Sequence, residues 1–330
     1  MTVFRSGFVA VVGRPNVGKS TLVNAMVGTK VTIVSPRPNT TRSQVRGVLN
    51  RPDALVVFVD TPGLHKPRTA LGERMNESAS SSLDDVDVVV AMVEATGAVG
   101  PGDRMVLAQS ARRVRAMARA AALQAELAVD PGSTIGDAIG DDPEGHGSPV
   151  LLVVVNKIDR VGGDGVLTHL TAVSDVIDGI DRDDGQAPVP VEYFPVSAVT
   201  GEGVPALLDA VVARLPEGPR YYPEGMVTDV AEAFWVADLV REELLHRVQD
   251  ELPHSIACRV TEWEWPRVRC EILVERDSQK GIVIGKGGAT LKEVGTAVRH
   301  QMPPGAYLEL FVRVEKHWQQ RDDALDRLGL

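Results

Sequence analysis

GRPNVGKS, residues 13–20, fits the pattern G-x-x-x-x-G-K-S, which forms a phosphate-binding loop between a strand and a helix. An apolar run at 7–12 precedes the motif and a periodic segment at 19–27 follows it, as that loop requires. Its glycines let backbone N–H groups close around phosphate oxygens at the positive end of the helix. We therefore expect a nucleoside triphosphate to bind Gly13, Arg14, Pro15, Asn16, Val17, Gly18, Lys19, Ser20 and Thr21.

Specific roles follow for the groups nearest the phosphates. Lys19 is expected to bridge the β- and γ-phosphates, and Ser20 to ligate Mg²⁺. Asp60 ends the apolar run 54–59, which puts it at the carboxyl end of a strand, where a second Mg²⁺ anchor is needed. Gly63 has no side chain to keep its N–H from the γ-phosphate. The nucleotide-binding residues predicted in this D-T-P-G motif are Asp60, Thr61, Pro62 and Gly63.

A third motif, N-K-I-D at 156–159, predicts which base is bound. The Asp159 carboxylate can accept two hydrogen bonds from guanine, from N1–H and the 2-amino group, and adenine offers neither. Binding ATP would leave that carboxylate desolvated and unpaired, which strongly favours GTP. Whether Asn156 contacts the purine or braces the phosphate loop stays open. The base-binding residues predicted are Asn156, Lys157, Asp159, Ser197 and Ala198, with a backbone N–H of the last pair for guanine O6.

Composition favours two globular domains. The chain has 330 residues, 44% of them apolar, and domains of about 100–200 residues are the norm. Cys258 and Cys270 are the only cysteines, which excludes a disulfide scaffold and favours a reducing cytosol. No apolar run reaches the ~18–20 residues of a membrane span, and the start does not read as a signal peptide. The net charge of −10 opposes a nucleic-acid partner, but residues 270–330 carry nine basic and nine acidic side chains and are neutral.

The first two hundred residues alternate short Val-rich runs with longer periodic segments. That alternation predicts an α/β fold, a doubly wound, mostly parallel sheet of the P-loop type covered by helices. The continuous apolar runs 54–59 and 151–155 are expected in its centre, because strands buried on both faces do not alternate. Expected strands are 7–12, 44–49, 54–60, 87–93, 149–156 and 190–196, and expected helices are 19–27, 70–82, 104–128, 165–178 and 204–214.

Two stretches of the first domain stand apart. Residues 129–148, rich in Asp, Gly, Pro and Ser, are expected to form a flexible loop. The preceding helix carries Arg112, Arg115 and Arg119 on one side, at i, i+3 and i+7. A solvated helix face is the favoured interpretation of these arginines, with an RNA contact as the alternative.

A segment dense in Pro and Gly at 215–225 marks a domain boundary. We expect a nucleotide-binding domain at 1–215, a linker at 216–228 and a second domain at 229–330. The second domain is expected to begin with a helix from Asp229, its cap, to about Gln249, followed by strands at 255–261 and 268–274. Both cysteines then share one core. A disulfide between them is sterically conceivable, but a reduced pair is favoured.

A G-x-x-G loop, Gly285 to Gly288, precedes a helix with apolar residues inward. In KH modules this loop clamps the backbone of single-stranded nucleic acid, because its glycines allow closer contact than any Cβ would. The order helix, strand, strand, G-x-x-G, helix, strand (306–314) predicts a smaller α+β domain of the KH type II fold. The RNA-binding residues predicted are Lys280, Gly285, Lys286, Gly287, Gly288 and Lys292.

The ordered motifs, together with the segment Thr40-Thr41-Arg42, resemble the Era family of bacterial ribosome-assembly GTPases over nearly the whole chain. The resemblance implies GTP and GDP as ligands with Mg²⁺, and a switch threonine that ligates Mg²⁺ in the triphosphate state. Thr41 matches that threonine best, with Thr40 as the near alternative. Catalysis is then expected to rest on Lys19, Thr41 and Gly63. Leu64 replaces the water-orienting Gln of Ras-like enzymes, so slow intrinsic hydrolysis is expected.

The resemblance also implies partners and a location. It implies binding to the 3′ end region of small-subunit (16S) ribosomal RNA and to the 30S subunit, whose assembly the protein would assist. It implies a cytoplasmic monomer with weak peripheral association at the inner face of the cell membrane, and Asn16 matches a K⁺ ligand of related GTPases. Two alternatives remain open: a P-loop kinase or ATPase whose C-terminal domain binds no RNA, and an RNA-binding scaffold that binds GTP without turnover.

Replacing Asp159 by Asn should change the base preference from guanine to xanthine. The Asn amide donates a hydrogen bond to the 2-carbonyl of xanthine, whereas the Asp carboxylate accepts one from the 2-amino group of guanine. Titrations of GTP, XTP and ATP against the wild type and Asp159→Asn measure the change. Wild-type protein that binds ATP as tightly as GTP would contradict the base assignment.

Overall fold

The computed structural model describes residues 3–64, 67, 69–128, 149–248 and 252–330. The chain divides into two compact units. The first comprises Met1–Thr32, Gln44–Leu64 and Ser78–Thr228, and the second comprises Ile33–Ser43, His65–Glu77 and Asp229–Leu330. The sequence places the division near residue 229 but assigns two short segments, 33–43 and 65–77, to the other domain. The loop predicted at 129–148 lies outside the described residues.

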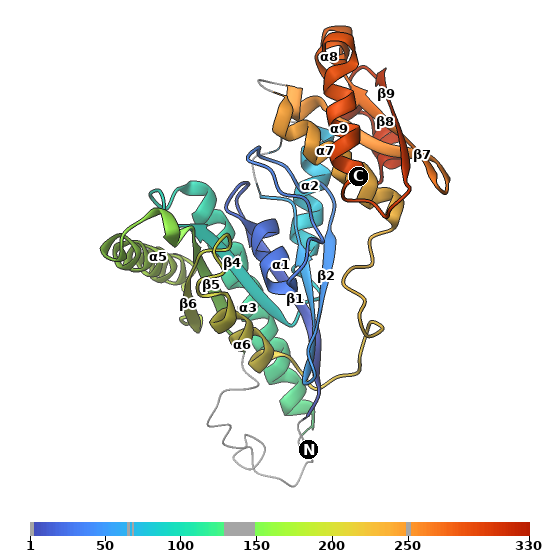
Figure 1. Ribbon diagram of the computed structural model, residues 1–330. Helices are drawn as coiled ribbons and strands as arrows, with labels where there is room; N and C mark the ends of the chain where they lie inside the picture. Colours follow the sequence, from blue (N-terminus) through green and yellow to red (C-terminus); the bar gives the residue numbers. More distant parts are fainter. Residues whose placement is uncertain (1–2, 65–66, 68, 129–148, 249–251) are drawn as a thin grey trace. The chain divides into compact units, whose positions relative to one another are not determined.

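The first unit contains a six-stranded sheet in the order β2-β3-β1-β4-β5-β6 (Figure 1). All neighbouring pairs are parallel except β2 with β3, so the predicted mostly parallel α/β sheet is confirmed. Its strands are β1 (Arg5–Gly13), β2 (Val45–Asn50), β3 (Ala54–Asp60), β4 (Val88–Glu94), β5 (Leu151–Asn156) and β6 (Val191–Val196). Its helices are α1 (Lys19–Val27), α3 (Pro101–Ala128), η1 (Ile158–Arg160), α5 (Gly163–Asp183) and α6 (Val204–Arg214), and α2 (Ala70–Ser81) runs from the second unit into the first.

Helices cover both faces of this sheet. Apolar side chains of α1 and α6 pack on one face, and those of α3, α5 and the end of α2 pack on the other. Every residue of β3 and of β5 is buried, which is why their apolar runs are continuous. Both strands lie inside the sheet, as predicted. The segment predicted as a linker is held to the sheet, since Val48 N donates to Val227 O at 2.8 Å and Ser6 N to Pro216 O at 3.0 Å.

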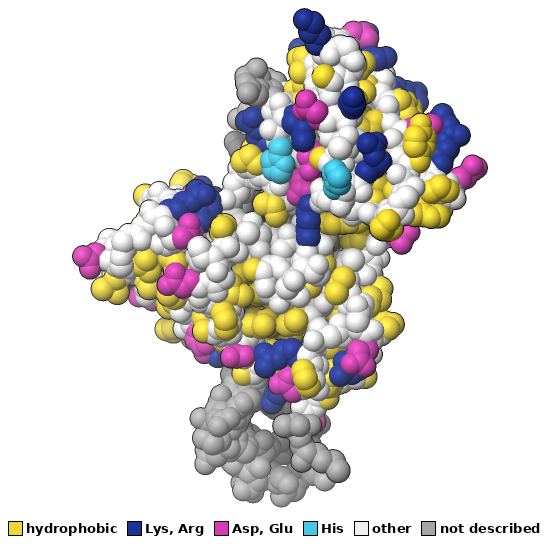
Figure 2. All heavy atoms as spheres, in the orientation of Figure 1, with side chains coloured by type: hydrophobic (Ala, Val, Ile, Leu, Met, Phe, Trp, Pro, Cys, Tyr) yellow, Lys and Arg dark blue, Asp and Glu magenta, His cyan; other side chains and the backbone are white. Residues whose placement is uncertain are grey.

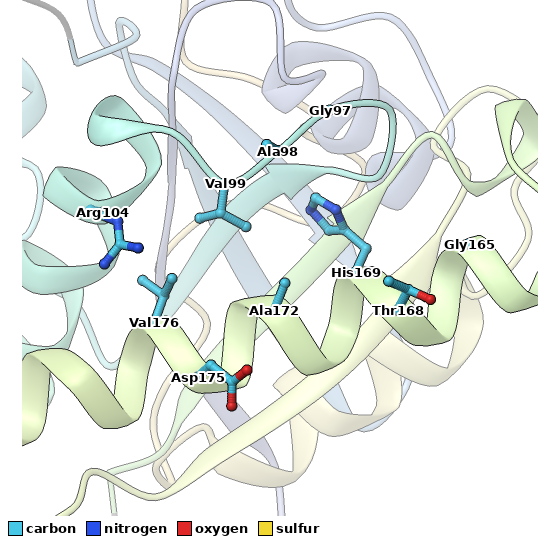
Figure 3. Close-up of a pocket in the computed structure, with 10 residues that line it drawn as sticks. All are labelled: Gly97, Ala98, Val99, Arg104, Gly165, Thr168, His169, Ala172, Asp175 and Val176. Atoms are coloured by element: carbon cyan, nitrogen blue, oxygen red, sulfur yellow. The ribbon is translucent and has the colours of Figure 1, made fainter.

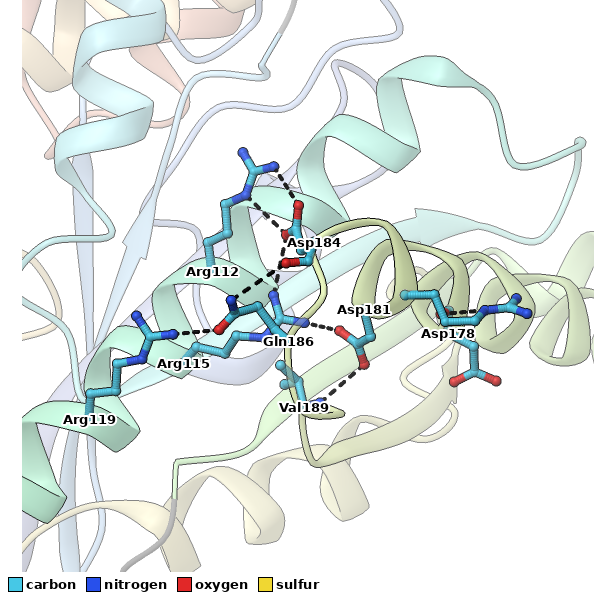
Figure 4. A network of polar contacts seen from close by, with 9 residues as sticks. Arg112, Arg115, Arg119, Asp178, Asp181, Asp184, Gln186 and Val189 are labelled. Atoms are coloured by element: carbon cyan, nitrogen blue, oxygen red, sulfur yellow. Dashed lines mark hydrogen bonds and ion pairs between the residues drawn. The ribbon is translucent and has the colours of Figure 1, made fainter.

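The prediction of a solvated arginine face on α3 holds for Arg112 and Arg119, which are exposed, but is wrong for Arg115 (Figure 4). Arg115 forms an ion pair with Asp181 in α5, and both side chains are nearly buried, at 11% and 7% exposure. Arg112 pairs with Asp184 at 3.1 Å, and Arg119 donates to Gln186. These arginines therefore join α3 to the end of α5. The predicted end of α5 at 178 is also wrong, because Ile180 still packs on the core and the helix continues to Asp183.

The second unit has a three-stranded sheet in the order β7-β8-β9, with β7 antiparallel and β9 parallel to β8. Its elements are α7 (Glu232–Arg247), η2 (Leu252–Ser255), β7 (Ala257–Glu264), β8 (Arg267–Val274), α8 (Asp277–Ile284), η3 (Lys286–Gly288), α9 (Ala289–Arg299), β9 (Tyr307–Val314), η4 (Trp318–Gln320) and α10 (Asp322–Leu328). The predicted order helix, strand, strand, G-x-x-G, helix, strand is confirmed from α7 to β9, and the structure adds α8 before the loop and α10 after β9.

The start of α7 and the state of the two cysteines can be compared with the predictions from the sequence. Helix α7 begins at Glu232 with Ala231 as its N-cap, so the prediction of Asp229 as the cap is wrong; Ala231 is still extended and the helix starts only after it. Both cysteines are free thiols, and both pack in the core formed with α7 and α9. A hydrogen bond with Cys258 and then burial raise the pKa of Cys270 well above its ordinary value, so it stays a thiol at neutral pH.

Asp181→Ala should lower the free energy of unfolding of the first unit by about 3–5 kcal/mol. The change leaves Arg115 nearly buried without its carboxylate and removes the acceptor of the Val189 N–H, now bound at 3.1 Å. Asp178→Ala, one turn earlier on the exposed side of α5, is the matched control and should cost less than about 0.5 kcal/mol. Urea unfolding followed by circular dichroism measures the free energy of unfolding of each variant. An equal decrease in both variants would mean that the contacts of Asp181 with Arg115 and Val189 do not stabilise the unit.

Candidate nucleotide site and nucleic-acid loop

The phosphate-binding motif forms the turn between β1 and α1. Asn16 and Gly18 have positive φ angles of 64° and 106°, and Gly18 caps α1. Gly63 passes so close to this turn that a Cβ on it would lie 2.5 Å from Pro15 N. The D-T-P-G backbone therefore lies in contact with the phosphate loop, an approach that only glycine at position 63 allows.

Lys19 is the buried cation of this loop. Its side chain lies under the turn, and its Nζ donates hydrogen bonds to Gly13 O and Arg14 O, both at 3.1 Å. Burial lowers the pKa of Lys19 to about 8, against the opposing attraction of Asp60. Anionic phosphates beside the ammonium would raise that pKa again.

Hydroxyl and carboxylate oxygens gather at the end of β3. Ser20 Oγ donates to Asp60 Oδ2 at 2.7 Å, and Thr32 Oγ1 donates to the same oxygen at 2.9 Å. Hard oxygen donors of this kind suit Mg²⁺, so Ser20 and Asp60 fit the predicted ion. Sequence reasoning missed Thr32, which no motif marks. Thr61 is fully buried and donates its hydroxyl to Val11 O at 3.1 Å, so this group holds β3 to β1.

Asn156 braces two loops, which is one of the two roles that the sequence leaves open for it. Its Nδ2 donates to Val17 O at 2.8 Å, and its Oδ1 accepts the Ala198 N–H at 3.0 Å. The sequence offers the N–H of Ser197 or of Ala198 to guanine O6, and both are engaged within the protein, since Ser197 N donates to Glu202 O at 2.9 Å. Asp159 Oδ1 accepts a hydrogen bond from Ser197 Oγ at 2.7 Å. The residues predicted to bind the base are therefore brought together.

Two carboxylates of the first unit were not predicted and contact these loops. Glu94 forms an ion pair with Lys157, whose Nζ also donates to Asn16 O at 2.8 Å. Asp103 accepts a hydrogen bond from Arg14 Nε at 2.6 Å. The only sequence signal for Glu94 is its place directly after an apolar strand, at the same edge of the sheet as Asp60.

A cavity of about 590 Å³ lies between the loop 97–99, Arg104 and helix α5 (Figure 3). His169 lines it and is buried, and its Nε2 has no hydrogen-bond partner among the described residues. Burial lowers the pKa of His169, so the imidazole is neutral at pH 7, although Asp103 and Glu94 oppose the shift. No residue predicted to bind nucleotide lines this cavity, so it is separate from the nucleotide site.

The segment that contains the candidate switch threonine belongs to the second unit. Val34 N donates to Glu242 Oε1 at 2.9 Å, and Arg241 Nη2 donates to Thr40 O at 2.5 Å. Arg42 Nη1 donates to Ile256 O at 2.6 Å. Thr41 itself is buried in this unit, and its role as a Mg²⁺ ligand stays a prediction.

The segment that follows D-T-P-G also packs in the second unit. Leu71 and Met75 of α2 share a small core with Trp318 of η4 and with Leu325 and Leu328 of α10. Arg74 Nη1 lies 2.6 Å from Asp326 Oδ1 and 2.7 Å from Leu330 O, and Nη2 lies 2.9 Å from Asp322 Oδ1. This arginine ties the first turns of α2 to the C-terminal helix.

The G-x-x-G loop turns between α8 and α9. Gly285 has a φ of 76°, and a Cβ on it would lie 2.2 Å from Thr290 Oγ1, so only glycine is accommodated there. Gly287 and Gly288, by contrast, face open space. Lys286 and Lys292 are exposed, Lys280 is half-buried, and Ile282 is 57% exposed next to the loop. Basic side chains are visible across the surface of this unit in Figure 2.

Comparisons with known proteins agree with both predicted domains, the nucleotide-binding domain and the KH domain. Residues 8–121 match the family described as 50S ribosome-binding GTPase, and residues 251–319 match the KH domain family. GTPase Era of Mycobacterium avium (strain 104) is 45% identical, and that of Mycobacterium tuberculosis (strain ATCC 25177 / H37Ra) is 43% identical, each with all of both chains covered. The chain belongs to the Era family of GTPases. Family membership confirms the predicted GTPase activity and the KH domain, and solved Era structures with MgGDPNP or with GDP and AlF₄⁻ confirm GTP and GDP with Mg²⁺ as cofactors.

Solved Era structures show the same arrangement of elements. Era in complex with MgGDPNP and nucleotides 1506–1542 of 16S ribosomal RNA is 33% identical, with a TM-score of 0.78 and 99% of both chains covered. A variant of Aquifex aeolicus Era bound to GDP and AlF₄⁻ is also 33% identical, with a TM-score of 0.77 and the same coverage. Within the described residues, no helix is both long and apolar enough to cross a membrane.

Nucleotide binding should take up a proton near pH 8. In the free protein, Lys19 with a pKa of about 8 is half-protonated there, and phosphates that raise this pKa must draw a proton from the buffer. Calorimetric titration of GDP at pH 8 in two buffers of different ionisation enthalpy should give an uptake of roughly half a proton. Affinity should also fall as the pH rises from 7 to 9, because fewer molecules carry the ammonium.

The uptake should shrink toward zero at pH 7, where Lys19 is already charged before GDP binds. A heat of binding that is the same in both buffers at pH 8 would contradict a phosphate contact by a Lys19 with a lowered pKa.

Proposed function

We propose that this Era-family GTPase is a GTP-dependent switch that binds the 3′ end region of 16S ribosomal RNA through its KH domain and assists assembly of the 30S subunit. The main support for the proposal is the structural similarity, over 99% of both chains, to Era in complex with MgGDPNP and nucleotides 1506–1542 of 16S ribosomal RNA. The nucleotide motifs and the G-x-x-G loop each form the turn that such ligands need.

The nucleotide half of the proposal assigns roles to the residues at the end of the parallel strands. Lys19 binds the β- and γ-phosphates, and Ser20 and Asp60 hold the Mg²⁺ ion, which neutralises charge on those phosphates. Gly63 offers its N–H to the γ-phosphate. Asp159 recognises the Watson–Crick edge of guanine, and Asn156 keeps the base loop attached to the phosphate loop at Val17 O.

The residue after D-T-P-G, Leu64, cannot orient the water that attacks the γ-phosphate, so hydrolysis depends on other groups. Leu64 is buried in the core of the first unit, at 4% exposure, and has no polar group to orient water. A backbone group, a cation or a partner must position the attacking water, so turnover is slow until one of them is supplied. A K⁺ ion near Asn16 is one such cation.

Coupling between nucleotide and RNA is proposed to run through the two short segments that join the second unit. A γ-phosphate that draws Thr41 toward Mg²⁺ must compete with the contacts of its neighbours Thr40 and Arg42 in the second unit. A switch requires a segment with two arrangements, here one favoured by the γ-phosphate with Mg²⁺ and the other by contacts within the second unit. The nucleotide state would then alter how the KH domain is held.

The RNA half rests on the loop and on its charges. Lys286 and Lys292 are exposed near the backbone of Gly287 and Gly288, which faces open space and admits close approach of a phosphate. Lys280 adds positive charge on α8, and Ile282 offers an apolar surface to an unstacked base. Residence in the cytoplasm as a monomer, with weak peripheral association at the inner membrane face, completes the proposal.

Replacing Lys286 and Gly287 by Asp together should weaken binding of RNA that matches the 3′ end of 16S ribosomal RNA by tenfold or more, about 1.4 kcal/mol per tenfold. Two carboxylates would face the phosphates where the loop allows the closest approach. A Cβ at Gly287 meets no atom, and Asp adopts this left-handed backbone more readily than most residues but with some strain, so the turn should survive at a small cost in stability. Fluorescence anisotropy with a labelled single strand measures the loss.

GTP affinity of this double variant is one control and should not change. Circular dichroism is the other: it should show a folded protein whose melting temperature is lowered only by the strain of a non-glycine residue at position 287. Lys316→Asp, a charge reversal of the same sign at an exposed position outside the predicted RNA loop, tests whether added negative charge alone weakens RNA binding by a long-range effect. RNA binding by the double variant at the wild-type affinity would show that the G-x-x-G loop is only a turn, and the RNA assignment would fail.

A further inference from the structure

The segment from Glu94 to Asp103 joins the end of β4 to the first turn of α3, and it carries a carboxylate at each end. Glu94 is the last residue of β4 and pairs in register with Asn156. Asp103 lies in the first turn of α3, where its Oδ2 accepts the Gly100 N–H at 2.9 Å. Neither residue belongs to any of the nucleotide motifs.

The carboxylate of Asp103 fixes the phosphate loop. Arg14 Nε lies 2.6 Å from Asp103 Oδ1, and Arg14 Nη2 lies 4.0 Å from Glu94 Oε1. The Asp103 side chain is only 3% exposed, so little water competes for it. A Cβ on Gly102 would lie 2.6 Å from Arg14 Cδ, which shows that Arg14 lies directly against the backbone of α3. The second residue of the phosphate loop is thus bound to a rigid helix.

The carboxylate of Glu94 fixes the base loop. It forms an ion pair with Lys157, and the same ammonium donates to Asn16 O at 2.8 Å. Lys157 and Asn16 are both non-glycine residues with positive φ, at 66° and 64°. Such conformations cost of order 1–3 kcal/mol and persist only when their surroundings hold them. The Glu94–Lys157–Asn16 chain connects these two strained residues.

We propose that Glu94 and Asp103 are positioning residues for guanine-nucleotide binding, which hold the N-K-I-D loop and the phosphate loop in their binding conformation through Lys157 and Arg14. The proposal rests on the assignment of those loops to the nucleotide. Each carboxylate acts through a basic side chain of the loop, Asp103 through Arg14 and Glu94 through Lys157. They hold the two loops in the binding conformation before the nucleotide arrives, so that binding does not have to order these loops. Removing either carboxylate should therefore weaken the affinity for guanine nucleotide.

The first test uses Asp103→Asn and Arg14→Met in the full-length chain. Asn keeps a carbonyl oxygen for the Gly100 N–H but loses the charge that binds Arg14. Each single variant should bind a fluorescent GDP analogue about fivefold to tenfold more weakly than the wild type. In the Arg14→Met background, Asp103→Asn should have no further effect, because its partner is already gone. A merely structural role for Asp103 would produce additive losses.

The second test uses Glu94→Gln, which should weaken the same GDP analogue about fivefold through the loss of the Lys157 ion pair. Glu126→Gln on α3 and Asp164→Asn on α5 are matched controls, because they remove one exposed carboxylate each from the same unit. Both controls should stay within about twofold of the wild type. Together they exclude a general effect of net charge on an anionic ligand.

Wild-type affinity in Asp103→Asn or in Glu94→Gln would overturn the role of that residue, and additive losses for Arg14 and Asp103 would overturn the proposed route. If Asp103→Asn does not fold, as circular dichroism would reveal, wild-type affinity in Arg14→Met overturns the phosphate-loop half. Failure of the wild-type chain to bind GDP would instead refute the nucleotide assignment, so the two failures are distinguishable.

Discussion

Parallel pairing of β3, β1, β4 and β5 is the constraint on which the nucleotide site depends. In register, Val11 lies beside Asp60, Gly13 beside Met92, and Glu94 beside Asn156. All four carboxyl ends therefore meet at one edge of the sheet, although their residues are separated by up to about 140 positions along the chain. A one-residue slip in any pair would exchange the side chains that pack on the two faces of the sheet and would move a motif about 3.3 Å along the strand, away from its partners at the edge.

The same constraint explains which parts of the site the sequence could predict. A motif that directly follows an apolar run is placed by the strand, so Lys19, Asp60 and Asn156 were all found where expected. Glu94 also ends a strand, but a single carboxylate after an apolar run is too common a pattern to mark it. Asp103 follows no strand, because its position is set by the first turn of α3.

The spacing of residues along a helix does not predict which side chains from distant parts of the sequence will contact it. The arginines of α3 have the spacing of a solvated face, and only the approach of α5 brings Asp181 and Asp184 beside them. The start of α7 was misplaced for a local reason, since Asp229 is an ordinary capping residue but the chain stays extended through Ala231. The order of elements in the KH domain was predictable, because its strands and its G-x-x-G loop are local patterns.

The second unit is built from three separated pieces of chain, and this has a consequence for biosynthesis. Leu71 and Met75 find their apolar partners in Trp318, Leu325 and Leu328, so this small core joins residues about 250 positions apart. A ribosome makes the chain from its N-terminus, and the early segments leave it long before the late ones exist. The first unit can complete its sheet while these apolar side chains are still exposed to water. The C-terminal unit therefore cannot finish folding until the last helix has been released.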